Sequence, residues 1–492
     1  MTTPRLAAST VPPAALLRTA PPERTGIVHL GLGNFHRAHQ AVHTAQALAH
    51  TDGPWGILGV AGRSTEVADA MREQDLRYSV LELSPHGSAA TVPAVHTGVL
   101  VAARQTDAVL DAIAAPDTRI VTITVTERGY TYSPRTHALD VDSEPVRADL
   151  RGDAPPRTTI GQIARGLQRR SRAGSGPITV LSCDNLGANG RRTRRLVREF
   201  IAELPAAERD ELEPWVAESV TFPNSMVDRI VPATTDEHRD AARTLLGARD
   251  AVPVPAEPFS MWVLEDEFAA GRPAWEHAGA LFTDDVEAYE LLKLRLLNGT
   301  HSLIAYLGAL DGCDTIPEAV GRPFIADAAR RALRDDYLPT LEVPDAIDAD
   351  DYVERLFERW ANSALRHRTR QVGSDGSVKL AQRVPDPALA HLRSGRVPQQ
   401  LALTVAAYLC CLAPAADAGP HAAAMSDPAR DALVESARRN GSTRSFVDDV
   451  LGGGLLGAEL AGHGEFAARV AELVDLITRH GPAAAVLETT AT

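Results

Sequence analysis

The stretch GIVHLGLGNFHRAHQ, residues 26–40, decides the fold of the N-terminal half of this sequence. A short apolar run is followed by Gly31 and Gly33 and then by a segment with helical composition. In dinucleotide-binding folds the first glycine permits a tight turn, and the second lets the backbone approach a pyrophosphate at a helix N-terminus. His36 stands where a third glycine is typical. The spacing alone therefore fits either a nucleotide site or an ordinary strand-to-helix turn.

Strand-like and helix-like segments alternate through the first half of the chain. The expected strands are 26–31, 55–62, 78–83, 119–126, 177–183 and 219–223, and the expected helices are 36–49, 104–115, 158–170 and 190–203. This alternation predicts an α/β fold with a doubly wound, mostly parallel sheet of the Rossmann type.

Helical spacing dominates after about residue 284. Helices are expected over 286–308, 323–335, 349–364, 398–413, 428–440 and 464–480, with loops near 134–157 and 369–397. The predicted organisation is a flexible lead-in over 1–25, a Rossmann-type dinucleotide-binding domain over 26–283, and a mainly α-helical substrate domain over 284–492.

Composition narrows the class of protein. The net charge of −14 argues against nucleic acid as a partner, because phosphate binding needs a concentrated basic surface. No apolar run reaches the roughly 18–20 residues of a membrane span, and the N-terminus lacks the long apolar region of a signal peptide. We therefore expect a cytoplasmic protein, a monomer or a small homo-oligomer, with a small-molecule substrate. Cys183, Cys313, Cys410 and Cys411 form no CxxC pair, which favours reduced core thiols and no metal site.

A polar constellation lies on the expected helix 286–308. Lys293, Asn298 and His301 project at about 0°, 140° and 80° around an α-helix, so they share one broad face. A partly desolvated lysine can act as a general base, and a neighbouring amide or imidazole can stabilise an oxygen that gains charge. These groups suit proton transfer coupled to hydride transfer. The alternative interpretation is a solvated lysine beside a core histidine.

Polar residues also follow several expected strands, at the edge where open α/β sheets bind ligands. They are Thr126 and Glu127 in TVTERGY, Asp184, Asn185 and Asn189 in SCDNLGANG, and Asn224 and Asp228 in FPNSMVDRI. After the second strand, Arg63 precedes the first acid, Glu66, so the sequence leaves NAD and NADP both open as cofactors.

Seven motifs occur in one order along the chain: GLGNFHRAHQA, TVTERGY, SCDNLGANG, FPNSMVDRI, FSMWVLED, YELLKLRLLNGTHSLIAYLG and SDGSVKL. Together they resemble the mannitol dehydrogenase family, the polyol-specific long-chain dehydrogenases, over about residues 26–385. The resemblance implies a zinc-independent oxidoreductase that uses NAD, or NADP, to act on a CH–OH group. The segment with Phe35, His36 and Arg37 is similar to the family's own form of the nucleotide turn.

The resemblance implies a role for each matched residue. Lys293 is similar to the family's catalytic general acid/base, and Asn189 and Asn298 to the pair that stabilises the alkoxide or carbonyl oxygen. His301 resembles the residue that orients substrate hydroxyls, and Glu290 a carboxylate linked to proton exchange with solvent. The expected substrate contacts are Val227, Asp228, His301 and Lys379, and the expected cofactor contacts are Gly31, Gly33, Phe35, Arg63, Thr126 and Glu127.

One position departs from the polyol-oxidising members, which carry an arginine where this chain has Gln371. The neighbouring Arg366, His367, Arg368 and Arg370 look more like the fructuronate reductase (mannonate oxidoreductase) branch. A carboxylate-bearing substrate needs a cation, ideally an arginine fork, and Arg370 is the candidate here. A solvated basic loop is the alternative. We expect D-fructuronate/D-mannonate as substrates, with mannitol/fructose or another polyol second. A non-catalytic dinucleotide-binding regulator and a zinc-dependent alcohol dehydrogenase are the competing classes.

Overall fold

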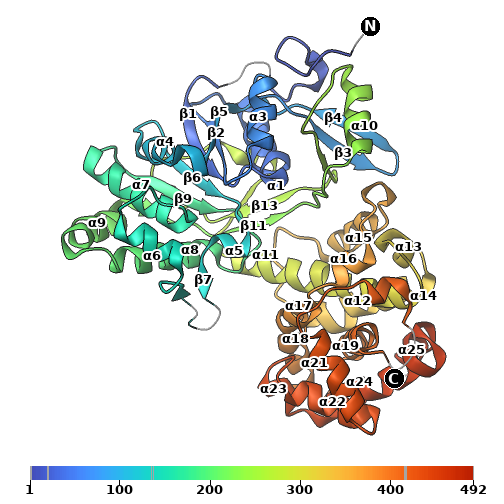
Figure 1. Ribbon diagram of the computed structural model, residues 1–492. Helices are drawn as coiled ribbons and strands as arrows, with labels where there is room; N and C mark the ends of the chain where they lie inside the picture. The colour runs from blue at the N-terminus through green and yellow to red at the C-terminus, as the bar shows by residue number, and fades with distance from the viewer. Residues whose placement is uncertain (1–2, 19–21, 134–135, 137, 415–417, 491–492) are drawn as a thin grey trace. The chain divides into compact units, whose positions relative to one another are not determined.

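The computed structural model describes residues 3–18, 22–133, 136, 138–414 and 418–490. The chain divides into two compact units, Met1–Glu287 and Ala288–Thr492. Every strand of the described residues lies in the first unit, and the described part of the second unit is helical (Figure 1).

A six-stranded parallel sheet forms the centre of the first unit, in the order β10-β9-β6-β1-β2-β5. Its strands are β1 (Thr25–Leu30), β2 (Gly56–Ala61), β5 (His96–Val101), β6 (Ile120–Ile123), β9 (Ile178–Ser182) and β10 (Val220–Thr221). The chain runs outward from β1 through β2 to β5 and then returns beside β1 to begin the other half at β6. This is the predicted doubly wound topology, and the ends of β1 and β6 flank its switch point, where such sheets bind ligands.

Helices bury both faces of this sheet. Ile27 and Ile120 belong to one core cluster, and their neighbours Val28 and Val121 belong to another. Because successive strand residues point to opposite faces, both faces are covered, which explains the nearly continuous apolar strands. The helices of this unit are α1 (Asn34–Ala38), α2 (Gln40–His50), α3 (Glu66–Glu73), α4 (Ala102–Ala114), α5 (Thr126–Gly129), α6 (Glu144–Arg151), α7 (Thr159–Ala173), α8 (Asn189–Ala202), α9 (Ala206–Ser219) and α10 (Asp236–Leu246).

The expected strand 78–83 is confirmed as β3 (Val80–Ser84), but it belongs to a separate sheet with β4 (Gly87–Thr91) and β12 (Val254–Ala256). The sequence interpretation missed β5, which takes the edge position of the central sheet. It also missed a third sheet, which contains β11 (Ser225–Asp228), β13 (Met261–Leu264) and β14 (Leu281–Phe282).

The segment expected to be a flexible lead-in is packed against the first unit over its described residues 3–18. Leu6, Val11 and Ala15 are buried in a cluster that also contains Leu246. The backbone of Leu6 donates to the carbonyl of Arg249 at 2.8 Å. The prediction failed because isolated apolar residues among prolines carry no periodic signal, although these three residues are buried in one core cluster.

The helix α11 (Val286–Leu292) begins at the end of the first unit and continues into the second. The helices of the second unit include the π-helical segment η3 (Lys293–Gly299), α12 (Thr300–Leu310), α15 (Ala349–Trp360), α19 (Gln399–Leu412), α21 (Arg430–Arg439), α22 (Thr443–Gly452) and α24 (Gly464–His480). The predicted loop 369–397 is wrong, because it contains α16 (Thr369–Gly373), α17 (Gly376–Arg383) and α18 (Pro385–Arg393). The predicted loop 134–157 falls partly outside the described residues and contains α6.

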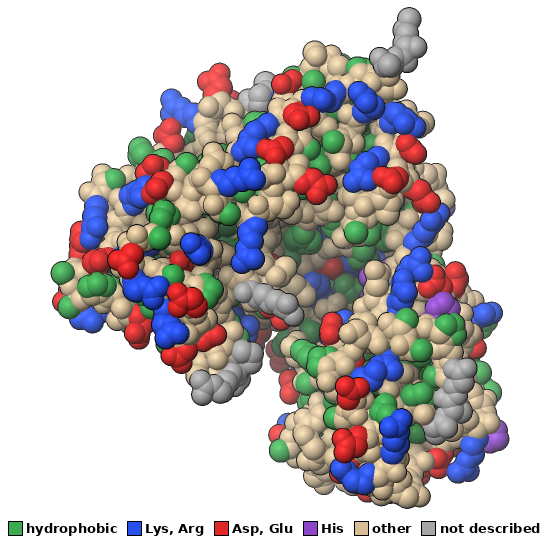
Figure 2. All heavy atoms as spheres, viewed as in Figure 1, with side chains coloured by type: hydrophobic (Ala, Val, Ile, Leu, Met, Phe, Trp, Pro, Cys, Tyr) green, Lys and Arg blue, Asp and Glu red, His purple; other side chains and the backbone are tan. Residues whose placement is uncertain are grey.

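The interior and the surface follow the composition. All four cysteines are buried, as core thiols should be. On the face shown in Figure 2, acidic and basic side chains are intermixed over both units. In the described ranges, no helix is long and apolar enough to cross a bilayer.

Candidate active site

The glycine turn after β1 is tightly packed at Gly31 and open at Gly33. Gly31 has φ +106°, and a Cβ there would lie 2.0 Å from the carbonyl oxygen of Thr124. Its N–H donates to the carbonyl of Val60 at 2.9 Å, which ties the turn to the neighbouring strand. A Cβ on Gly33, the residue before α1, would meet only the carbonyl oxygen of Gly31 at 3.8 Å. The backbone is therefore open at Gly33 for the approach of a phosphate group, as the dinucleotide interpretation requires.

His36, which replaces the third glycine, is fully buried beneath this turn. Its ring stacks on His29 with centroids 3.4 Å apart, and its Nε2 lies 3.3 Å from Nε2 of His96. The first helix is short, because the backbone leaves helical geometry at His39 and α2 starts again at Gln40. Imidazole stacking thus fills the space that close helix packing occupies in the glycine-rich form of the turn.

Arg37 fastens the turn to the rest of the unit. Its guanidinium donates to the carbonyls of Gly33 and Val252 at 3.3 and 2.6 Å and to Oδ1 of Asn34 at 2.7 Å. The Tyr78 hydroxyl donates to the carbonyl of Arg37 at 2.9 Å. These bonds give Arg37 a structural role at the nucleotide turn.

The buried histidines make stability depend on pH. Burial lowers the pKa of His29 and of His96 to about 3, and it also lowers the pKa of His36 well below its usual range. Unfolded histidines titrate near 6.5, so below that pH the unfolded state takes up protons that the folded state refuses. The contribution of these histidines to the free energy of unfolding is therefore fully present above about pH 6.5 and is lost as the pH drops from 6.5 toward 3.

We expect the free energy of unfolding to drop by about 2 kcal/mol for each such histidine between pH 7 and pH 5. Urea unfolding at both pH values measures this loss, and His96→Gln should show a smaller one. The exposed His86 offers a matched control, since His86→Gln should behave as the parent. Equal losses in the parent and in His96→Gln would contradict the assignment.

The remaining cofactor positions after β1 and β2 are more open. Phe35 is partly exposed, and its ring lies 5.0 Å from that of His39. Arg63 is exposed just beyond β2, and the exposed Glu66 begins α3. Contacts of Phe35 and Arg63 with a cofactor stay predictions.

Asp184 joins the ends of β6 and β9. Its carboxylate accepts from the backbone N–H groups of Val125 and Thr126, each at 3.0 Å, and from the Tyr130 hydroxyl at 2.8 Å. Burial raises the pKa of Asp184, against these hydrogen bonds. Thr126 is held at φ +67°, and Glu127 beside it is exposed. The expectation that TVTERGY and SCDNLGANG meet at one sheet edge is confirmed.

Asn189 is fully buried and spans two of the predicted motifs. Its Oδ1 accepts from the N–H of Ser225 at 2.9 Å, and its Nδ2 donates to the carbonyls of Ser225 and Asp184 at 2.7 and 3.1 Å. Both N–H groups of the amide are thus bonded to backbone, whereas Asn185 is exposed. A role of Asn189 at the reacting oxygen stays a prediction, and it requires one of these bonds to be exchanged.

Val227 and Asp228 lie on β11, opposite Trp262 and Met261 of β13. Both are 4% exposed, and Val227 packs in a core cluster with Trp262. Their contact with a substrate stays a prediction.

In the second unit, Lys293, Asn298 and His301 lie on one continuous helix, as expected, but its middle is not α-helical. The segment η3 begins at Lys293 and ends at Gly299. Lys293 and Asn298 are five residues apart, which is the hydrogen-bond spacing of a π-turn, so they lie closer to one face than the expected 140°. Such π-segments are frequent at functional sites. Lys293 is 9% exposed.

His301 lies one turn further, 7% exposed, and its Nε2 has no hydrogen-bond partner among the described residues. Burial lowers the pKa of His301 well below its usual range, and His367, Arg383, Arg359 and Lys379 lower it further. The imidazole is therefore neutral and keeps an unused polar atom. Its electrostatic surroundings are cationic.

Lys379 and Arg383 lie one turn apart on α17. The Lys379 ammonium donates to the carbonyls of Ser374 and Val372 at 2.7 and 3.2 Å. Burial, and then the charge of Arg383, lower the pKa of Lys379. Arg370 is exposed on α16. Glu290 is partly exposed on α11, three residues before Lys293.

Two family models match the chain: the mannitol dehydrogenase Rossmann domain over residues 25–277 and the mannitol dehydrogenase C-terminal domain over residues 285–477. The chain belongs to the mannitol dehydrogenase family. The resemblance read from the seven motifs is confirmed.

Relatives in this family differ in substrate. D-mannonate oxidoreductase of Escherichia coli K12 is 39% identical over 391 residues, 78% of this chain and 79% of that protein. Mannitol 2-dehydrogenase of Cereibacter sphaeroides is 39% identical over 447 residues, 89% and 92% of the two chains. The crystal structure of D-sorbitol dehydrogenase has a TM-score of 0.86 at 30% identity, over 99% of this chain and 100% of that one. A Pseudomonas fluorescens mannitol 2-dehydrogenase complex with NAD and D-mannitol has a TM-score of 0.82 at 32% identity, with the same coverage.

The sequence reasoning from the family missed Arg383. The motif SDGSVKL ends three residues before it, and a Lys-x-x-x-Arg pair on a short helix is typical of a solvated face. The feature of the sequence that could have pointed to Arg383 is Lys379, which lies one helical turn earlier on the same face of α17.

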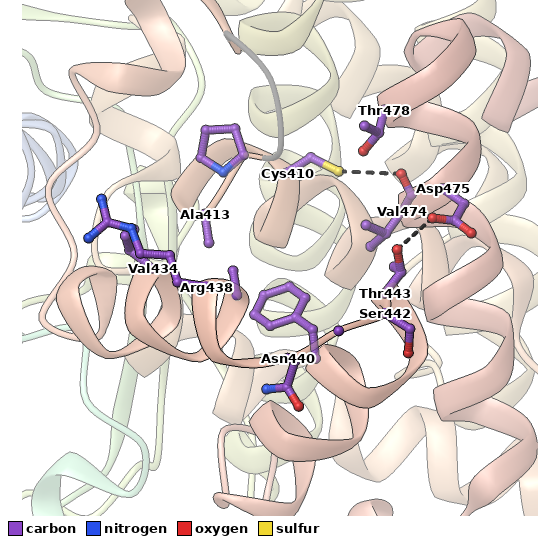
Figure 3. A pocket seen from close by; sticks show the side chains of 14 residues that line it. Cys410, Ala413, Val434, Arg438, Asn440, Ser442, Thr443, Val474, Asp475 and Thr478 are labelled. Carbon is purple, nitrogen blue, oxygen red and sulfur yellow. Dashed lines mark hydrogen bonds between the residues drawn. The ribbon is translucent and has the colours of Figure 1, made fainter.

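A cavity of about 480 Å³ lies in the second unit (Figure 3). It is lined from α19, α21, α22 and α24, and none of the predicted catalytic or binding residues borders it. Cys410 closes one side, where its Sγ contacts the carbonyl of Val474 at 3.9 Å. Thr443 donates to Asp475 at 2.6 Å on the same wall.

Proposed function

We propose that this chain is an NAD-dependent oxidoreductase that interconverts a keto sugar acid and its hydroxy acid, with D-fructuronate and D-mannonate as the pair. The observation that carries the substrate class is the cationic surrounding of His301, in which Lys379 is the cation that we assign to the substrate carboxylate. A substrate carboxylate needs a cationic side chain, with which it forms strong charge-assisted hydrogen bonds. The similarity to D-mannonate oxidoreductase supports the same choice.

The proposed chemistry assigns a step to each group on the long helix. Lys293 accepts the proton of the substrate hydroxyl in oxidation and returns it to the forming alkoxide in reduction. Asn298, with Asn189, holds the oxygen as its charge changes, and the neutral His301 orients a neighbouring hydroxyl. Glu290 passes the proton between Lys293 and solvent.

The glycine turn fits the cofactor, because Gly33 leaves the backbone open where a pyrophosphate would approach. NAD, when bound, supplies the acceptor or donor of the hydride. Gly31 and Gly33 would hold its phosphates, and Phe35, Arg63, Thr126 and Glu127 would line the rest of its site. NADP is the second choice of cofactor, since Arg63 could pair with a 2′-phosphate.

Mannitol 2-dehydrogenase activity is the second candidate. It is supported by the 39% identity to the Cereibacter sphaeroides enzyme and by the fold match to the mannitol complex. Gln371, at the position where polyol-oxidising members carry arginine, favours the sugar acid instead.

An absorbance assay at 340 nm separates the two candidates. Purified protein is mixed with NADH or NADPH and with fructuronate, tagaturonate or fructose in turn. We expect kcat/KM for a hexuronate to exceed that for fructose by about 10³-fold, because the uncharged ketose cannot form the charge-assisted hydrogen bonds that a carboxylate forms with Lys379. Activity on fructose and on none of the uronates would refute the sugar-acid assignment and leave the family assignment intact.

A further inference from the structure

Arg383 ends α17 and reaches the helix that carries the proposed catalytic groups. Its Nη1 donates to the carbonyl oxygen of Asn298 at 2.9 Å and to Oγ of Ser302 at 2.7 Å. Its Nε has no hydrogen-bond partner among the described residues. The guanidinium therefore bonds to the backbone at Asn298 and to the side chain at Ser302, on either side of His301 in the sequence.

The carbonyl of Asn298 lies where η3 passes into α12. A carbonyl at such a junction tilts out of the regular ladder and is open to other donors. Here it accepts from Arg383 and also from the Ser302 hydroxyl at 3.3 Å. The wide turn is thus held by side chains.

Burial destabilises the charged form of Arg383. Burial lowers the pKa of Arg383, and the groups that raise it are Tyr306 and Tyr337. An arginine used only for stability is more cheaply paired with a carboxylate at the surface, because burying a guanidinium costs several kcal/mol. The cost is consistent with a functional constraint at this turn.

Tyr337 limits how the segment can move. A Cβ on Gly299 would lie 2.3 Å from the Tyr337 hydroxyl, so the π-turn is packed tightly on that side. Arg383 holds the carbonyl group of Asn298 in place through its hydrogen bond. Loss of either contact would let Asn298 and His301 shift together.

We propose that Arg383 is a positioning residue, which acts through the Asn298 carbonyl and Ser302 to hold Asn298 and His301 in place for the reaction. This inference rests on the proposed function, in which the Asn298 and His301 side chains contact the substrate. A displacement of about 1 Å in such groups can cost about 100-fold in rate.

The test compares Arg383→Ala and Arg383→Lys with the parent. We expect Arg383→Ala to lower kcat by about 10- to 100-fold, with a smaller change in KM and an unchanged Kd for NADH. Arg383→Lys should retain part of the turnover, because its ammonium can donate to the same acceptors but lacks the planar geometry that fixes the guanidinium. Added methylguanidine should restore part of the turnover of Arg383→Ala, which a general loss of stability would not allow.

Arg469→Met is the matched control. Arg469 is a buried arginine of the second unit, and it bonds to Gln399 on α19 and to Glu472 on its own helix, α24. We expect it to change melting temperature without changing kcat. An Arg383→Ala enzyme with kcat within twofold of the parent would overturn the proposal.

Hydrogen exchange of the amides at 298–302 gives a readout that needs no substrate. We expect exchange at least tenfold faster in Arg383→Ala than in the parent. If the parent turns over none of the ketoses tested, the proposed function fails, and the exchange rates still decide whether Arg383 holds the turn. Unchanged exchange would overturn the positioning role even in an active enzyme.

Discussion

Replacing Lys293 with alanine is expected to lower kcat by about 10³-fold at neutral pH. The variant loses the only group to which we assign proton transfer with the substrate oxygen. Lys293 starts the π-helical segment of the second unit, whereas the glycine turn belongs to the first unit. The Kd for NADH, measured by fluorescence titration, should therefore change by less than about threefold.

Chemical rescue separates a proton-transfer role from a packing role. Small primary amines, such as methylamine, should restore part of the turnover of Lys293→Ala, in proportion to amine concentration and basicity. Glu290→Gln is a useful companion variant, because it should slow proton exchange with solvent while leaving Lys293 in place. Turnover of Lys293→Ala within tenfold of the parent would show that the assigned base is wrong.

The glycine turn predicts opposite outcomes for two neighbouring substitutions. Gly31→Ala should lower the free energy of unfolding by about 2–4 kcal/mol, since φ +106° disfavours any side chain and the new Cβ would collide with the Thr124 carbonyl. Gly33→Ala should leave melting unchanged, because its Cβ meets nothing closer than 3.8 Å. It should instead weaken NADH binding by about tenfold, through a methyl group placed where the phosphates approach.

Thermal unfolding and NADH titration of both variants, each at one pH above 7, test this contrast. Equal stability of Gly31→Ala and the parent would show that the turn is less constrained than its backbone indicates. Normal NADH affinity in Gly33→Ala would move the phosphate site away from this turn.

Much of the first unit could be predicted from the sequence, because buried parallel strands and a glycine turn leave strong local patterns. Strand 119–126 and its neighbours were found for this reason. The edge strand β5 was missed, since HTGVLV carries a glycine and no clear alternation. The sequence predicts a loop over 369–397, because glycine, proline and charge mark the breaks between three short helices there.

The kinds of residues in the candidate site could be predicted from the sequence, but their geometry could be predicted less well. Polar residues after β6 and β9 were expected to meet, and Asp184 joins them. The Asn189 amide donates hydrogen bonds to the carbonyls of Ser225 and Asp184. These bonds depend on the conformation of a turn, which residue spacing in the sequence does not predict. Arg383 was missed because a cation near a helix end is normally solvated, and only tertiary contact distinguishes it.

The π-turn between α11 and α12 fixes the length of the chain between Lys293 and His301. A π-turn holds one residue more than the α-turn it replaces, so α12 starts about 100° out of phase with α11. Nearly every residue of α12 is buried, and the packing of that helix sets its rotation. Loss of one residue in η3 would therefore force a choice between the rotation of a core helix and the orientation of Lys293. The register of this helix is therefore constrained both by core packing and by the proposed chemistry. Insertions and deletions, which loops usually tolerate, are not tolerated in η3.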